Sequence, residues 1–227
     1  MSTTLPALCA SALAIGVFHT LVGPDHYLPF VALSKARRWS RRRTVLITAG
    51  FGLAHTVGTV LLGTLGLLIG LELGWLTSIE ALRGDVAAAG LLGIGVLYTG
   101  WAVWRLVRHR YTHHHDHAPA IGNDPDRSHT GALPAPMLSW GLFLVFVFGP
   151  CEALIPLLMY PAAHHDAFGV VLVTGVFVLA TVTTMLAAVG VSLWGLERLK
   201  VETLAPYADV LAGATLTACG GAILAGL

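Results

Sequence analysis

The sequence predicts an all-α, polytopic membrane protein with six transmembrane helices, arranged as a 3+3 inverted repeat with broken helices one and four. Three observations predict this class: the composition, the apolar runs, and a Gly-Pro pair that recurs in the second half. Of the 227 residues, 56% are hydrophobic and 11% are charged. Soluble domains carry about a quarter charged residues, so the composition indicates an integral membrane protein.

Apolar runs of roughly 17–25 residues are long enough to cross a bilayer. Runs that meet or exceed this length fall near residues 7–30, 44–71, 84–106, 136–160, 167–195 and 205–227. Proline lacks a backbone N–H and clashes with the preceding helical turn, so Gly23-Pro24 and Gly149-Pro150 predict breaks in the first and fourth spans. Broken segments survive within a membrane only where they are buried in protein or line a cavity.

The chain divides into a first three-helix repeat (1–106), a histidine-rich linker (107–135) and a second three-helix repeat (136–227). Gly23-Pro24 and Gly149-Pro150 are 126 residues apart, and the similar stretches that begin at Gly50 and Gly175 are 125 apart. Three spans per half is an odd number, so the two halves are expected to insert in opposite orientations.

Charge sets the expected orientation. All basic residues except Arg83 lie in the three loops that share one side: Lys35, Arg37, Arg38, Arg41, Arg42, Arg43, Arg105, Arg108, Arg110, Arg127, Arg198 and Lys200. The positive-inside rule places these loops in the cytoplasm and both termini outside, in a bacterial cytoplasmic membrane. Tryptophans near the span ends fit an interfacial belt: Trp39, Trp75, Trp101, Trp104, Trp140 and Trp194.

Two acidic residues follow the Gly-Pro pairs. Asp25 and Glu152 occupy apolar segments in which an ionisable group is costly and marks a functional site by default. Histidines accompany Asp25: on a helix, seven residues make almost two turns, so His19 and His26 would share a face. Imidazoles and carboxylates together suit divalent transition metals. The alternative is a structural network in which Asp25 and a histidine neutralise each other.

The predicted metal ligands are His19, Asp25, His26, His55 and Glu152. His55 lies in the second span among small residues that allow a neighbouring helix to approach closely. By the repeat, Glu152 stands in the place of His26 and could ligate the metal or carry a proton exchanged for it. Additional candidates are Cys151, Thr56 and Thr181, although threonine in such helices commonly bonds its own backbone.

The linker contains a histidine cluster: His113, His114, His115 and His117. Clustered histidines bind borderline divalent cations adaptably, so we expect an accessory role in metal capture. The alternative is a solvated linker whose histidines have no function.

The pattern His19…Asp25-His26 on the first span, with Ala54-His55-Thr56 on the second, resembles the signatures of the nickel/cobalt transporter superfamily. It is most similar to the compact six-span branch of urease-accessory and nickel/cobalt-efflux-like permeases, which is similar in turn to the lysine-exporter-type superfamily with its 3+3 inverted repeats. Two features depart from the family pattern. Here the two histidines are seven residues apart instead of six, and Phe18 stands where an arginine often precedes the first.

We therefore expect a secondary transporter, not an enzyme, that moves a divalent transition-metal cation across the membrane. Nickel or cobalt comes first, with zinc, manganese and iron open, and the metal is substrate instead of a permanently bound cofactor. Efflux is slightly favoured over uptake by the histidine-rich cytoplasmic loop. Expected partners are membrane lipids and the metal ion but no nucleic acid; a homo-oligomer or a metallochaperone stays open.

Two other functions stay open at this point. An exporter of small organic or sulfur-containing anions would need positive charge at its site, whereas Asp25 and Glu152 are negative. A membrane thiol-disulfide electron carrier would need two cysteines that approach each other. The chain has Cys9, Cys151 and Cys219, with no closely spaced pair.

Overall fold

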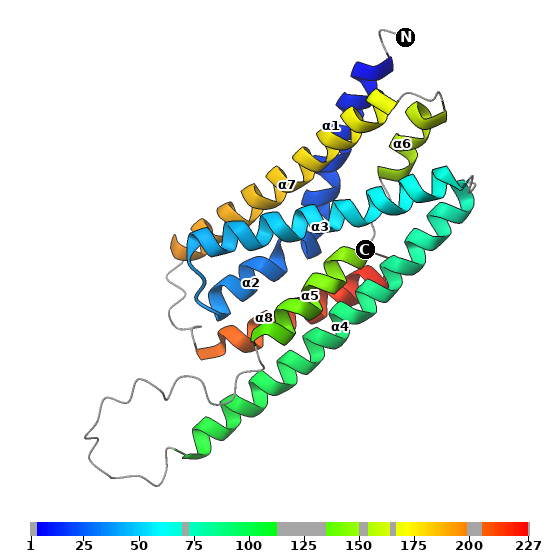
Figure 1. Cartoon of the computed structure of the whole chain (residues 1–227). Coiled ribbons are helices and arrows are strands. Elements are labelled where there is room, and N and C mark those ends of the chain that lie inside the picture. The colour runs from blue at the N-terminus through cyan, green and yellow to red at the C-terminus, as the bar shows by residue number, and fades with distance from the viewer. Residues whose placement is uncertain are drawn as a thin grey trace.

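The structure, a computed structural model, describes residues 4–69, 73–112, 135–149, 154–163, 167–198 and 206–226. All regular elements in these ranges are helical, which confirms the predicted all-α class (Figure 1). In chain order they are α1 (Thr4–Val22), the 3₁₀ turn η1 (Pro24–His26), α2 (Leu28–Ala36), α3 (Arg41–Leu68), α4 (Leu73–Thr112), α5 (Ala135–Phe148), α6 (Leu154–Ala163), α7 (Ala167–Arg198) and α8 (Ala208–Leu224).

Four of the described helices, α1, α3, α4 and α7, contain stretches long and apolar enough to cross a membrane. Only 17% to 33% of each of these stretches is buried inside the molecule, which shows that most of their apolar residues face outward. Leu97 and Val171, for example, are 73% and 70% exposed. An apolar exterior of this kind is unfavourable in water and favourable in lipid, so the surface is compatible with a transmembrane protein.

The first predicted break is confirmed. Helix α1 ends at Val22, directly before Gly23-Pro24, and α2 begins only at Leu28. The chain between them turns tightly, with the His26 N–H donating to the Gly23 carbonyl at 3.1 Å. In the second half, α5 ends at Phe148 and α6 begins at Leu154, while residues 150–153 lie outside the described part of the chain.

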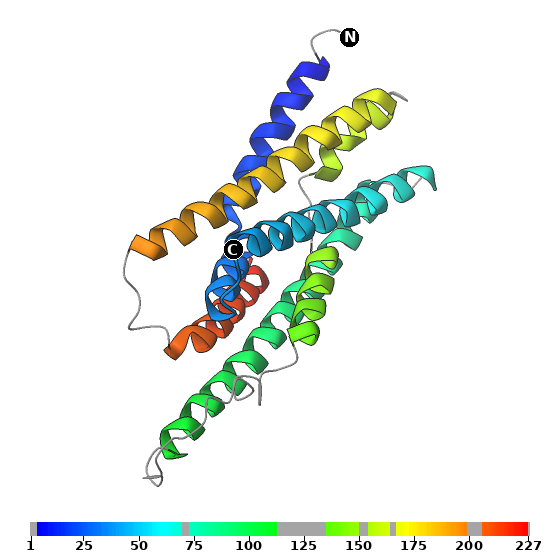
Figure 2. The same cartoon turned by 60° about the vertical axis from the view of Figure 1, so that its left-hand side comes forward.

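Helices from the two halves of the chain pack against each other. Helix α1 packs along α7, α3 contacts α5, α6 and α7, and α4 packs along α8 (Figures 1 and 2). The α4–α8 contact is close because glycines leave room for the opposing backbone. A Cβ atom on Gly213 would lie 2.7 Å from the Thr99 nitrogen, and one on Gly220 would lie 2.8 Å from the Leu92 Cα. Small residues bring membrane helices together in the same way.

The third predicted span, residues 84–106, is part of a longer helix. Helix α4 begins at Leu73 and runs to Thr112, so it includes Arg83, the one basic residue outside the three basic loops. Glu80 and Arg83 lower the mean hydropathy of the region before residue 84. For this reason the apolar pattern does not predict that the helix begins as early as Leu73. The two side chains form an ion pair within α4, and Glu80 is fully buried.

Arginine–tryptophan pairs gather where several helices end on one side of the molecule. The Arg108 guanidinium lies 4.3 Å from the centre of the Trp104 ring near the end of α4, and Arg198 lies 4.0 Å from the centre of the Trp194 ring near the end of α7. Figure 1 shows these two helix ends on the same side as the start of α3. This side, which carries the basic residues flanking the described helices, is called the basic end below.

Candidate metal centre

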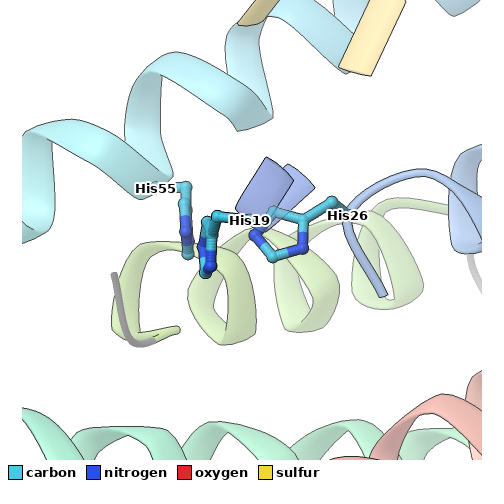
Figure 3. Close-up of side chains that lie close together, drawn as sticks. All are labelled: His19, His26 and His55. Atoms are coloured by element: carbon cyan, nitrogen blue, oxygen red, sulfur yellow. The ribbon is translucent and has the colours of Figure 1, made fainter. Parts of the chain in front are cut away.

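Three of the predicted ligands come together from three separate elements. His19 lies in the last turn of α1, His26 ends η1, and His55 lies in the middle of α3. The rings of His19 and His26 are 4.6 Å apart between centroids, and those of His26 and His55 are 5.2 Å apart. Figure 3 shows the three imidazoles grouped together. The break after α1 is what makes this possible, because it turns His26 towards α3.

Each of the three histidines offers a buried ligand atom. One ring nitrogen from each lies within 4.8 Å of the corresponding atoms of the other two. The Nε2 atoms of all three are buried and have no hydrogen-bond partner. Buried polar atoms are nearly always satisfied, so three unsatisfied ring nitrogens in one histidine cluster call for an explanation, and a bound ion is one.

A hydrogen bond fixes the tautomer of His55. Its Nδ1 lies 3.1 Å from the carbonyl oxygen of Phe146 in α5. A carbonyl only accepts, so Nδ1 must carry the hydrogen, which leaves a lone pair on Nε2. The last carbonyls of a helix lack intrahelical partners. Pro150, four residues after Phe146, has no N–H to offer. The end of α5 therefore supplies the acceptor that orients His55.

His26 is oriented by two acceptors. Its Nδ1 lies 3.1 Å from the Gly23 carbonyl oxygen and 3.2 Å from Oδ1 of Asp25. Nδ1 therefore carries a hydrogen, and in the neutral ring Nε2 keeps its lone pair. Metal-binding histidines commonly have such a carboxylate or carbonyl behind them, which fixes the ring and raises its basicity. Asp25, predicted as a ligand, contacts the far nitrogen of His26 and thereby positions it.

Glycines make space for both of these rings. A Cβ atom on Gly23 would lie 2.6 Å from Nδ1 of His26, and one on Gly149 would lie 3.1 Å from Nδ1 of His55. Beside the rings is a cavity of about 30 Å³, lined by Asp25, His26 and His55 and by residues of α4, α5 and α8. This volume exceeds the roughly 10–15 Å³ that a cavity needs to hold one water molecule.

The other predicted site residues divide into two groups. The Thr56 hydroxyl donates to the carbonyls of Gly52 and Leu53 in its own helix, each at 3.1 Å, so it is engaged away from the histidines. Thr181 is buried in α7, its hydroxyl has no hydrogen-bond partner, and it lies close to Gly16 of α1. The remaining candidates lie outside the described residues: Cys151, Glu152, His113, His114, His115 and His117.

The cysteines of the described region do not form a pair. Cys9 packs in a cluster formed by α1, α6 and α7, whereas Cys219 belongs to a separate cluster around Leu91, Tyr98 and Leu216. Both are free thiols. This separation gives no support to thiol-disulfide electron transfer between these two residues.

Glu80 and Arg83 of α4 are further candidate functional residues, which the sequence patterns described above do not predict. Arg83 pairs with Glu80 and donates to the Val147 carbonyl at 3.0 Å, directly beside the carbonyl that holds His55. A signal was present, because opposite charges three residues apart face each other on a helix. The spacing alone did not predict a buried pair, because both residues lie before the apolar run predicted as the third span.

The chemistry of the three imidazoles fits a divalent transition metal. Neutral imidazole nitrogens are ligands for zinc, copper, iron and nickel, and three of them leave positions open for water or a further protein group. Comparisons with protein-family models, with curated proteins and with solved structures gave no match.

Proposed function

We propose that this protein is a secondary transporter of a divalent transition-metal cation, with nickel or cobalt as the first candidates. The observation that carries the proposal is a cluster of three histidines, each with a ring nitrogen within 4.8 Å of the other two, whose Nε2 atoms are all buried without a hydrogen-bond partner. The apolar exterior is a second observation that supports the proposal, since a transporter needs a buried metal site between lipid-facing helices.

The helix contacts support six spans in a 3+3 inverted repeat. Exchange of the two halves would relate α1 and α2 to α5 and α6, α3 to α7, and α4 to α8. The contact of α1 with α7 then has its counterpart in that of α5 with α3, and the contact of α2 with α8 has its counterpart in that of α6 with α4. Inverted repeats with broken helices near the midplane are a known transporter architecture.

In this proposal the histidines replace part of the hydration shell of the cation. His19, His26 and His55 bind it, and the negative charge of Asp25 behind His26 offsets its positive charge. The two halves would rock about this site so that it opens to one side at a time. Glu152 remains a proposed additional ligand or proton carrier, and Cys151 a further ligand. The sequence has no nucleotide-binding motif of the Walker type, so protons, the membrane potential or a separate energising subunit would supply the energy.

The proposed setting is a bacterial cytoplasmic membrane, with the basic end in the cytoplasm and the termini outside. The linker histidines would capture metal there, which favours efflux slightly over uptake. The preference for efflux rests on a sequence observation: basic residues flank the third and fourth spans, which the linker joins, and this places the linker in the cytoplasm.

Cobalt(II) binding to the purified protein tests the proposal. The parent should bind Co²⁺ with an absorption spectrum of nitrogen ligation, and His55→Ala should lower the affinity by at least about 100-fold because a ligand is removed. Thr56→Val is the matched control: it changes the adjacent buried residue, whose hydroxyl bonds its own helix, and should bind as the parent does.

Transport is measured with the same variants in liposomes that carry a metal-sensitive dye. The parent and Thr56→Val should move Co²⁺ or Ni²⁺ across the membrane and His55→Ala should not. A parent protein that folds but neither binds nor moves any of these metals would refute the proposal.

A further inference from the structure

A buried ion pair lies beside the metal centre and is not explained by metal binding. Glu80 is fully buried, and the side chain of Arg83 is 16% exposed. The Thr59 hydroxyl donates to Oε1 of Glu80 at 2.7 Å, and Arg83 donates both to Glu80 and to the Val147 carbonyl. These contacts tie α3, α4 and the end of α5 together at one point.

The ion pair is one helical turn from the histidines. Thr59 follows His55 by four residues on α3, a rise of about 6 Å along the helix axis. Val147 follows Phe146, so consecutive carbonyls at the end of α5 hold Arg83 and His55. Gly58 lies at the crossing, where a Cβ atom would come within 3.0 Å of an Arg83 nitrogen. Whatever moves Arg83 away from α5 therefore also disturbs the acceptor of His55.

The pair lies on the side of the histidines that faces away from the basic end. Glu80 and Arg83 belong to the first turns of α4, and Figure 1 shows this end of α4 opposite the side on which α2 and α7 finish. On the other side of His55, one turn back along α3, Phe51 packs on Phe30 and Phe146 with ring centroids 5.3 and 5.5 Å away. The metal centre is thus enclosed by an ion pair on one side and by aromatic rings on the other.

A buried ion pair is an expensive way to join helices. Removing two charges from water costs several kcal/mol per ion, and apolar residues of similar volume often give equal or greater stability. In a membrane segment such groups commonly mark ion pathways. An ion pair can also be opened by a passing cation, because the carboxylate can exchange its arginine for the cation.

We propose that Thr59, Glu80 and Arg83 form the gate that closes the metal centre on the side away from the basic end. Arg83 is the tethered cation that holds the gate shut by binding Glu80 and the end of α5. When Arg83 swings away, the Glu80 carboxylate faces the path of a cation that leaves the imidazoles. The inference rests on the proposed transport function, since a gate requires a path.

The experiment measures access to the cavity beside the histidines without any metal. Ala87 lines this cavity and is 5% exposed, so Ala87→Cys is the reporter, placed in a chain whose three natural cysteines are replaced by alanine. The protein is reconstituted in vesicles, and a maleimide that does not cross membranes is added on the side of the N-terminus. The gate variant is Glu80→Gln/Arg83→Gln, which removes both charges and leaves neither partner as a lone buried charge.

The double variant should label at least about tenfold faster than the parent, as expected when an open form populated at a few per cent becomes a major one. Arg41→Gln is the matched control because it removes a surface ion pair with Glu197, in which the Arg41 side chain is 88% exposed. It should label at the parent rate. Equal labelling rates in the double variant and the parent would overturn the proposal.

A second reporter separates a gate from general loosening. Ala212→Cys lies in the core cluster of α4 and α8 and is 1% exposed. It should stay unreactive in every variant, and a parallel rise at Ala212 and Ala87 would make the pair merely structural. Because no labelling step uses metal, the labelling decides the gate even if the parent neither binds nor moves any of the tested metals, a result that would refute only the transport function.

Discussion

Hydrogen-bond acceptors behind the rings orient two of the three histidines. His55 and His26 are both held through Nδ1 by acceptors that helix breaks leave available, namely the Phe146 carbonyl, the Gly23 carbonyl and the Asp25 carboxylate. In the neutral rings this leaves Nε2 free to bind a metal. The glycine-proline break after α1 thus serves two purposes, because it bends the chain and provides hydrogen-bond acceptors that orient His26.

At the residue scale, Asp25→Asn should weaken metal binding less than His26→Ala. The carboxylate lies behind His26, and the loss of such a supporting group typically costs 10–100-fold in metal affinity. His26→Ala removes a ligand and should abolish measurable binding. Co²⁺ titration of both variants checks this order. Equal losses in the two variants would instead make Asp25 a direct ligand, as the sequence alone suggested.

Gly23→Ala should also weaken Co²⁺ binding, by at least about tenfold, although it adds only a methyl group. The new Cβ would lie 2.6 Å from Nδ1 of His26 and must displace the ring. Gly50→Ala is the control, since nothing lies within 4 Å of a Cβ at that position of α3. If the two variants bound Co²⁺ equally well, the position of the His26 ring would not matter for binding.

At the element scale, the crossing of α4 and α8 depends on glycine. Gly95, Gly213 and Gly220 each bring a backbone of one helix against the other, and the adjoining core contains Tyr98 and Leu216. Tyr98 adds a polar contact, donating to Asp209 of α8 at 2.6 Å. Residues of both helices, among them Leu91 and Ile223, line the cavity, so this close crossing supports one of its walls.

Gly213→Ala should therefore lower stability by about 1–3 kcal/mol, the usual cost of overpacking. The added Cβ meets backbone atoms of Thr99, which cannot move as a flexible side chain would. Gly100→Ala lies in the same helix pair but meets nothing within 4 Å, and its stability should equal or exceed that of the parent. Thermal unfolding in detergent compares the two. A similar midpoint for both would show that α8 can shift to accept the methyl group.

At the scale of the whole molecule, the histidines on the proposed transport path have an ion pair on one side and aromatic rings on the other. The ion pair is Glu80 with Arg83, and the rings are those around Phe51. The candidate metal centre draws on both halves: His19, His26 and His55 come from the first half, while Phe146 of the second half orients His55. Rocking of one half against the other would therefore change the hydrogen bond that orients His55 together with access to the site.

Deletion of residues 112–118 tests the accessory role of the linker. Maximal transport should stay near the parent value, while the metal concentration on the linker side that gives half-activity should rise. A flexible histidine cluster raises the local metal concentration without forming the path itself. Liposome transport at several metal concentrations separates the two effects. Complete loss of transport would make the linker part of the path.

The sequence by itself determined the all-α class, the apolar helices and the break after α1. It also singled out the three histidines as candidate metal ligands. These follow from local properties: hydropathy over a window, the missing N–H of proline, and the rarity of ionisable residues in apolar segments. The six-span repeat and the roles of Glu152 and Cys151 stay predictions.

Only the tertiary structure decided which ring nitrogens are available, that Asp25 positions His26, and that Glu80 and Arg83 join the end of α5. Each depends on atoms brought together from distant parts of the chain, such as Arg83 with Val147 and His55 with Phe146. Hydropathy even worked against the ion pair, because two charges lower the apolar average while their mutual attraction, visible only in the folded chain, permits their burial. The packing of the helices sets the distances between such residues, and the apolar pattern of a single segment does not predict them.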